Sequence, residues 1–178
     1  LSLLTRRLTS AENQEVKQAT IRALGKIGGD ESRRLLIDLM EQGDTPPDIR
    51  EATLESLVFL SERGEMDRAV HDVFEQHLTA SQTTVRALAI RGLSYSPFRG
   101  AADLLYPLVN SETDQDVLVQ VVRSLDRLGD ANMGKSFTAL LRSQDTTDRI
   151  RRELINALGD DTVGVQALPF MLPHLGWE

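Results

Sequence analysis

The chain has 178 residues, of which 40% are hydrophobic and 26% are charged, a balance typical of a folded globular chain rather than a disordered one. Its formal net charge of −7 opposes the negatively charged backbone of nucleic acids, so we expect no nucleic acid among its partners. It has no cysteine and no run of about 18 consecutive apolar residues. These absences exclude disulfide frameworks, thiolate zinc sites, cysteine nucleophiles and a helix inserted across a membrane.

Residues 1–12 are predicted to be the tail of a helix that belongs to a preceding repeat. They carry Leu3, Leu4 and Leu8 ahead of the polar pair Thr9-Ser10. No leader-peptide pattern follows Leu1. We therefore expect a cytoplasmic location and a chain that is one segment of a larger protein.

From residue 13 onward, one apolar pattern returns five times. It starts at Val16, Ile49, Val85, Val117 and Ile150. Another aliphatic residue follows five positions later (Ile21, Leu54, Ile90, Val122 and Ile155), and a leucine follows eight positions later (Leu24, Leu57, Leu93, Leu125 and Leu158). The residue before that leucine is always small: Ala23, Ser56, Gly92, Ser124 and Ala157. Because these offsets share one face of a helix, each repeat is predicted to open with an amphipathic helix whose small residue lets a neighbouring helix approach closely.

A second apolar cluster with helical spacing follows in every repeat, and no sustained period of two indicates a strand. Each repeat is therefore predicted to be a helix, a tight turn and a second helix. The first helices fall in 13–25, 47–61, 82–95, 114–128 and 147–159, and the second in 30–44, 62–80, 99–113, 130–146 and 160–178. The repeats themselves, 13–46, 47–81, 82–113, 114–146 and 147–178, are predicted to form a single array. Gly25, Gly28 and Gly29 are predicted to end the first of these helices.

The segment from Val16 to Asp30 resembles the HEAT repeat and, more narrowly, the short HEAT-like unit of phycobilisome lyases. The residues that carry the resemblance are Val16-Lys17, Ala23-Leu24-Gly25 and Ile27-Gly28-Gly29-Asp30, and parts of the pattern return as Ile49-Arg50, Val85-Arg86 and Ala157-Leu158-Gly159-Asp160. Gln120 and Glu153 depart from the pattern at its alanine position, and Leu118 replaces its arginine. The resemblance implies an all-α fold, a right-handed α-α superhelix of the HEAT/armadillo solenoid type, with second helices on its concave side.

Few residues of the sequence are arranged for catalysis or metal binding. His71 and Glu75 are one helical turn apart and could share a metal with Asp67, but a solvated helix face is the interpretation that we favour. No nucleophile motif or phosphate-binding loop is present. We predict no catalytic residue, no metal site and no cofactor. The arginines Arg50, Arg86 and Arg151, with Lys17, are expected to pair with acidic residues of neighbouring repeats rather than to form a basic binding stripe.

Most of the negative charge falls in the second-helix segments, whereas the first-helix segments are close to neutral. An acidic groove would suit a protein partner with a basic segment. Projecting each second helix away from its apolar face gives the candidate contact residues Arg34, Asp38, Glu41, Arg68, Asp72, Asp103, Tyr106, Arg142 and His174. A second candidate is the turn Tyr95-Ser96-Pro97-Phe98-Arg99, because exposed aromatic residues beside arginine are typical binding anchors. The alternative for Phe98 is a lid over the core of the third repeat.

The leading functional hypothesis is a non-enzymatic protein-protein interaction scaffold that binds its partner along the concave second-helix face. The resemblance leaves a bilin lyase or chaperone-lyase subunit as the alternative. A DNA-lesion enzyme on a HEAT-like scaffold would need a basic, aromatic-lined groove, and the acidic second-helix segments argue against it.

Overall fold

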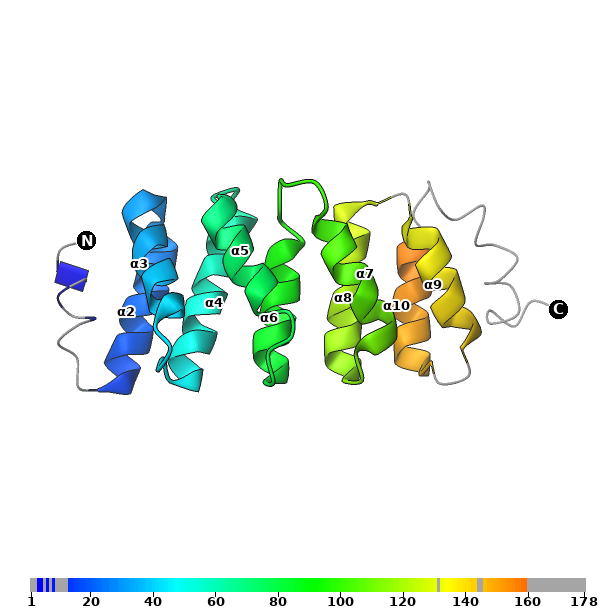
Figure 1. The fold of residues 1–178 in the computed structure, drawn as a ribbon, viewed down its shortest axis with the longest axis horizontal. Coiled ribbons are helices and arrows are strands. Elements are labelled where there is room, and N and C mark those ends of the chain that lie inside the picture. The colour runs from blue at the N-terminus through cyan, green and yellow to red at the C-terminus, as the bar shows by residue number, and fades with distance from the viewer. Residues whose placement is uncertain are drawn as a thin grey trace. The chain divides into compact units, whose positions relative to one another are not determined.

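The computed structural model describes residues 3, 4, 6, 8, 13–130, 132–143 and 146–159. These residues form helices and turns, with no strand among them (Figure 1). The chain divides into two compact units, Leu1–Arg99 (unit one) and Gly100–Glu178 (unit two). In the described ranges, no helix combines the length and the apolar composition that a membrane crossing requires.

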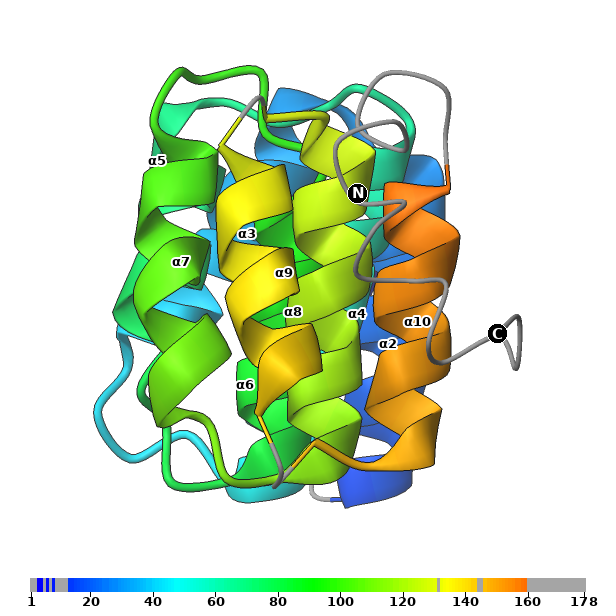
Figure 2. The same cartoon turned by 90° about the vertical axis from the view of Figure 1, so that its right-hand side faces the viewer.

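Unit one contains five helices within its described residues: α2 (Gln14–Ile27), α3 (Gly29–Glu41), α4 (Pro47–Glu62), α5 (Arg68–Gln76) and α6 (Thr83–Leu93). The first helices of successive repeats, α2, α4 and α6, are neighbours in one layer (Figure 1, Figure 2). The second helices α3 and α5 pack against them in another layer. Ahead of α2, the described residues Leu3, Leu4, Arg6 and Leu8 have helical backbone.

Unit two has the same arrangement of first and second helices. Its described residues form α7 (Ala101–Ser111), α8 (Gln115–Leu128), α9 (Met133–Arg142) and α10 (Asp148–Leu158). The first helices α8 and α10 are neighbours, and the second helices α7 and α9 pack against them. The predicted second helix in 160–178 lies outside the described residues.

The helix ends follow from local chemistry. Asn13 caps α2 by accepting a hydrogen bond from the backbone N–H of Glu15, and Asp67 caps α5 in the same way through Val70. Gly28 ends α2 with φ of 74°, a left-handed value that favours glycine. Gly25 was expected to end this helix as well, and that expectation is wrong. Gly25 lies inside α2, where an added Cβ would come within 2.8 Å of the Ser56 Cβ on α4.

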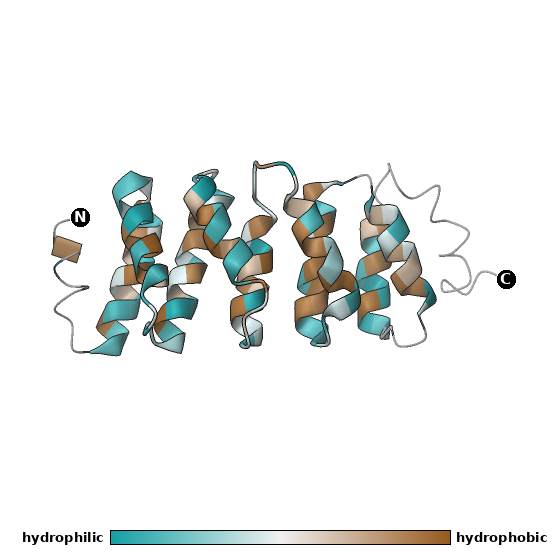
Figure 3. Ribbon diagram, in the orientation of Figure 1, coloured by the Kyte–Doolittle hydropathy of each residue, from teal (hydrophilic) through white to brown (hydrophobic). Residues whose placement is uncertain are grey.

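The core of unit one is built from the predicted columns. The fifth-position and eighth-position residues are fully buried in all three repeats: Ile21, Leu24, Leu54, Leu57, Ile90 and Leu93. Unit two repeats this in α8 with Val122 and Leu125 and in α10 with Leu158, while Ile155 is only half-buried and Leu154 is fully buried beside it. Hydrophobic residues recur along every described helix rather than gathering in one segment (Figure 3). Burial is therefore shared between repeats, as a stack of helix pairs requires.

Polar contacts also join neighbouring first helices. In unit one the pairs are Gln14 and Gln18 with Asp48, Arg22 with Glu55, Glu51 with Thr84, and Glu62 with Arg91; in unit two they are Asp116 with Arg149, and Arg123 with Glu153. Each pair joins a residue on one first helix to a residue on the next. Hydrogen bonds and ion pairs thus join neighbouring first helices within each unit.

Arg50 and Arg151 of the arginine column play a different part from the one predicted. Arg50 donates to the Thr45 carbonyl at 3.2 Å, and Arg86 donates to the Ala80 carbonyl at 2.8 Å. Arg151 pairs with Asp148 of its own helix at 3.3 Å. For Arg50 and Arg151, the expected pairing with acids of neighbouring repeats is therefore wrong among the described residues. Arg50 and Arg86 lie one turn into their helices, and their side chains reach back to the loops that enter those helices.

Candidate functional site

The predicted contact residues of α3, Arg34, Asp38 and Glu41, form one exposed stripe together with Glu31, which was not predicted. The four residues recur every three or four positions, so they lie on one side of the helix. None of these four side chains makes a hydrogen bond or ion pair with a described residue, whereas the neighbouring Arg33 pairs with Asp30 and Asp67. We call these four residues the α3 stripe. It carries three carboxylates and one guanidinium, so it is acidic.

A pocket of about 580 Å³ opens beside the α3 stripe and shares Asp38 with it. Its apolar lining comes from Leu8, Leu35, Leu39, Pro46 and Ile49, and its polar lining from Gln14, Lys17, Asp38, Gln42, Asp44 and Thr45. The Thr45 hydroxyl donates to the carbonyls of Leu39 and Gln42, at 2.7 and 2.9 Å. Together with the Arg50 contact to the Thr45 carbonyl, these bonds hold the loop that forms one wall of the pocket.

The residues predicted on α5 meet the turn that follows α6. Arg68 pairs with Asp72 at 2.9 Å, and its guanidinium lies 5.5 Å from the centre of the Phe98 ring. The same ring makes an edge-on contact with His71, with 5.3 Å between the ring centres. Phe98 therefore packs on α5 of the preceding repeat. It is half-buried there, so it is neither a free aromatic anchor nor a lid confined to the third repeat.

Tyr95 and Phe98 do not act as one patch. The Tyr95 hydroxyl donates to the Glu62 carboxylate on α4 at 2.9 Å, which takes Tyr95 toward the first-helix layer. Phe98 instead contacts α5, and Arg99 is exposed. The turn thus fastens α6 to both helices of the preceding repeat.

In unit two, Asp103 and Arg142 are exposed, as predicted, on α7 and α9. Tyr106 is half-buried, and its hydroxyl donates a 2.6 Å hydrogen bond to the Asp130 carboxylate. Burial and this hydrogen bond raise the pKa of Tyr106 well above its ordinary value, while the same bond lowers the pKa of Asp130. Tyr106 is therefore committed to an internal contact. The remaining candidate, His174, lies outside the described residues.

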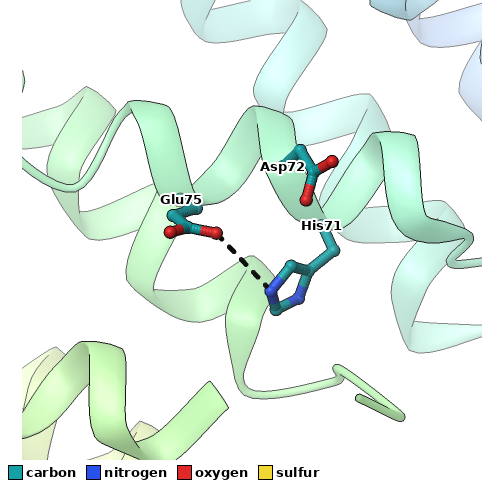
Figure 4. A group of neighbouring side chains, drawn as sticks. All are labelled: His71, Asp72 and Glu75. Carbon is teal, nitrogen blue, oxygen red and sulfur yellow. Dashed lines mark ion pairs between the residues drawn. The ribbon is translucent and has the colours of Figure 1, made fainter. Parts of the chain in front are cut away.

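His71 differs most from the sequence interpretation. A solvated position was favoured, but the side chain is 3% exposed and its Nδ1 lies 2.9 Å from the Ser96 hydroxyl. Burial, together with the nearby Arg68 guanidinium, lowers the pKa of His71. Asp67, which was considered as its metal-binding companion, instead caps α5 and pairs with Arg33. Asp72 takes its place beside His71 and Glu75 (Figure 4).

Sequence reasoning missed an exposed apolar pair on the first-helix layer. Phe59 on α4 is 43% exposed, Ile27 at the end of α2 is 51% exposed, and Arg63 lies 5.7 Å from the centre of the Phe59 ring. A small pocket of about 160 Å³ adjoins Phe59. Both residues stand outside the apolar columns of their repeats, ten and eleven positions after Ile49 and Val16. A large apolar residue outside these columns was therefore the signal in the sequence that could have identified them.

Comparison with known proteins agrees with the helix-pair architecture. The family model for HEAT repeats matches residues 1–71 and 71–159. None of the curated proteins that were compared matches the chain.

Among solved structures, the chain is similar to crystal structures of engineered proteins from the Northeast Structural Genomics Consortium. One has 17% identity and a TM-score of 0.66, with 98% of this chain and 90% of that chain covered. Another has 19% identity and a TM-score of 0.62, with coverages of 96% and 87%. At this identity the likeness shows the fold alone, and it confirms the predicted all-α solenoid class. The lyase-type subclass stays a prediction, and the family match shows that the chain belongs to the HEAT repeat family.

Proposed function

We propose that this chain is a non-enzymatic scaffold that binds a protein partner through a basic segment, on the second-helix side of unit one. HEAT repeats generally mediate protein–protein interaction, and the partner's chemistry is what the proposal adds. The contact surface is the α3 stripe together with its adjoining pocket. The supporting observation is that two unpaired carboxylates, Asp38 and Asp44, line a pocket that also has apolar residues in its wall.

The charges of this surface are available to a partner. Asp38 and Glu41 make no ion pair with a described residue, and Asp44 at the pocket rim makes none either. An arriving lysine or arginine therefore need not break an existing pair. Exposed carboxylates each contribute little in water and are screened by salt, so they favour encounter and choice of partner more than affinity.

The pocket supplies the rest of the binding energy. Its volume of about 580 Å³ lies within the range of side-chain and small-ligand sites, and Leu35, Leu39 and Ile49 line it. An aliphatic or aromatic side chain that enters it would bury apolar surface against these residues. The partner segment is thus expected to carry lysine or arginine on either side of one large apolar residue.

The experiment is a selection from a peptide display library with the full chain as bait, followed by calorimetric titration of an enriched synthetic peptide. Enriched sequences should place basic residues beside a large apolar one. The double variant Asp38→Asn/Glu41→Gln should weaken the affinity for that peptide about tenfold at low salt and by much less at 0.5 M salt, because the lost interaction is electrostatic. Leu35→Trp, which fills the pocket, should weaken binding at both salt concentrations.

The matched control is Asp103→Asn on α7, an exposed carboxylate outside the proposed surface. It should leave the peptide affinity unchanged. Thermal unfolding of every variant checks that the fold is retained. The proposal is overturned when the selection yields acidic peptides or no shared pattern, or when Asp38→Asn/Glu41→Gln binds the enriched peptide as tightly as the unaltered chain.

A further inference from the structure

We infer that His71, Asp72 and Glu75 on α5 form a binding site for a divalent transition-metal ion of the zinc type. One ring nitrogen of His71 and one oxygen from each carboxylate lie within 4.8 Å of one another. Figure 4 shows the His71 ring and the Glu75 carboxylate turned toward each other, with Asp72 on the same helix beside them. This site does not depend on the proposed function.

His71 is the organising residue of the site. Its side chain is only 3% exposed, and its Nε2 lies 3.9 Å from the Glu75 carboxylate, a separation too long for a hydrogen bond. Nε2 makes no hydrogen bond with any described residue and is not among the buried polar atoms that lack a partner, so solvent reaches it. A ring nitrogen that solvent can reach, and that faces a carboxylate without bonding to it, marks a place where a cation fits.

The other ring nitrogen has its own hydrogen-bond partner. Nδ1 lies 2.9 Å from the Ser96 hydroxyl, and this hydroxyl accepts a 3.2 Å hydrogen bond from the Phe98 backbone N–H. When Nδ1–H donates to Ser96, the lone pair of the imidazole is on Nε2 and points to Glu75. Metal-binding histidines are usually fixed in this way by a hydrogen bond on the second nitrogen.

The two carboxylates complete the donor set and give access from solvent. The side chains of Asp72 and Glu75 are 46% and 43% exposed, so an ion can reach Nε2 from their side. In a tetrahedral zinc site, metal–ligand bonds of about 2.0–2.2 Å separate neighbouring donors by roughly 3.4 Å. A small rotation of the exposed Glu75 side chain from its present 3.9 Å reaches that spacing. One imidazole and two carboxylates suit zinc or a neighbouring transition metal better than magnesium, which prefers oxygen ligands alone.

Arg68 gives the proposal its sharpest test. Its guanidinium pairs with Asp72 at 2.9 Å, so a metal must take this carboxylate away from a competing cation. Removal of the Arg68 charge by Arg68→Gln should therefore tighten metal binding several-fold. A cluster that serves only to pack α5 against the turn would show no such gain.

The experiment titrates the full chain with zinc chloride by calorimetry at pH 7.5 and follows the histidine ring nitrogens by long-range ¹H–¹⁵N NMR. Zinc should shift the Nε2 resonance of His71. Asp72→Asn and Glu75→Gln keep the side-chain shapes and should each weaken zinc binding about tenfold or more, and Ser96→Ala should weaken it by about 10–100-fold. His77→Gln is the matched control, because His77 lies on the same stretch but its Nδ1 bonds the Val73 carbonyl at 2.7 Å. It should leave the His71 signal and this affinity unchanged.

Two results overturn the inference. One is a His71 Nε2 resonance that does not move when zinc is added. The other is a zinc affinity that Glu75→Gln and Arg68→Gln both leave as it was, which would assign any measured heat to other residues of the chain.

Discussion

The ring of Phe74 on α5 occupies the space in which a side chain on Gly92 of α6 would begin. A Cβ added to Gly92 would overlap Cε1 and Cζ of that ring, well inside the 3.0 Å that Cβ contacts respect. Gly92→Ala should therefore lower the free energy of unfolding by about 1–3 kcal/mol, because an overpacked core must shift its ring or its backbone. Urea unfolding followed by circular dichroism measures the change.

Gly43→Ala is the matched control, because a Cβ at Gly43 meets nothing within 4 Å. It should change the free energy of unfolding by less than about 0.5 kcal/mol. In the Gly92→Ala background, Phe74→Leu should lower the free energy of unfolding by less than it does alone, because the smaller side chain relieves the overlap. Additive losses in that double variant would show that the two residues do not oppose each other.

The bond between Tyr106 and Asp130 gives a second prediction. Tyr106→Phe removes the 2.6 Å hydrogen bond but keeps the ring, so we expect a loss of about 1 kcal/mol in the free energy of unfolding. The pKa of Asp130 should rise toward its ordinary value in this variant, because the Tyr106 hydroxyl is the main cause of its lowering. Carboxyl ¹³C NMR across an acid titration measures the pKa of Asp130 in the unaltered chain and in the variant. An Asp130 pKa that stays where it was would contradict the assignment.

The pair formed by Arg123 and Glu153 predicts an acid dependence. The bidentate contact, at 2.7 and 3.0 Å, lowers the pKa of Glu153. A carboxylate whose pKa is lower in the folded state stabilises that state above its unfolded pKa of about 4.3, and this contribution is lost as pH falls through the folded pKa. Glu153→Gln should therefore cost about 0.5 kcal/mol at pH 7 and progressively less below pH ~4.3. Equal losses at pH 7 and pH 3 would contradict the ionic origin.

His71 predicts a separate dependence near neutral pH. Its folded-state pKa is lowered, so below about pH 6.5 the unfolded chain binds a proton that the folded chain resists. Arg68 contributes to that lowering, while Asp72 and Glu75 oppose it. The melting temperature, measured with a chelator present, should fall between pH 7 and pH 5. His71→Gln should remove this fall, and His77→Gln should keep it.

The repeat architecture could be predicted because it depends on short-range periodicity. Three apolar columns at offsets 0, 5 and 8 place residues such as Leu54 and Leu57 on one helical face, and both are fully buried. The small residue at offset seven was predicted to allow close approach, and Gly92 against Phe74 is one such contact. The offset-five column does not hold everywhere, since Ile155 is only half-buried.

The candidate site could be predicted only where the periodicity of a single helix determines which residues are exposed. The α3 stripe follows from projecting Arg34, Asp38 and Glu41 away from the apolar face of a single helix. The position of Phe98 on His71 depends on the path of the turn after α6, which no periodicity encodes. The sequence also favoured Asp67 over Asp72 as the acid beside His71. Asp67 immediately precedes α5 and caps the N-terminus of that helix, so it is not available to His71.

The seams between first helices also bear on how such an array can grow. α4 presents carboxylates to both neighbours, with Asp48 and Glu55 toward α2 and with Glu51 and Glu62 toward α6. A gene duplication that placed two copies of this helix side by side would set acid against acid at the new junction. Lengthening the protein by copying this repeat would therefore require compensating substitutions. The charges that each first helix presents to its neighbours thus restrict which repeat can follow which.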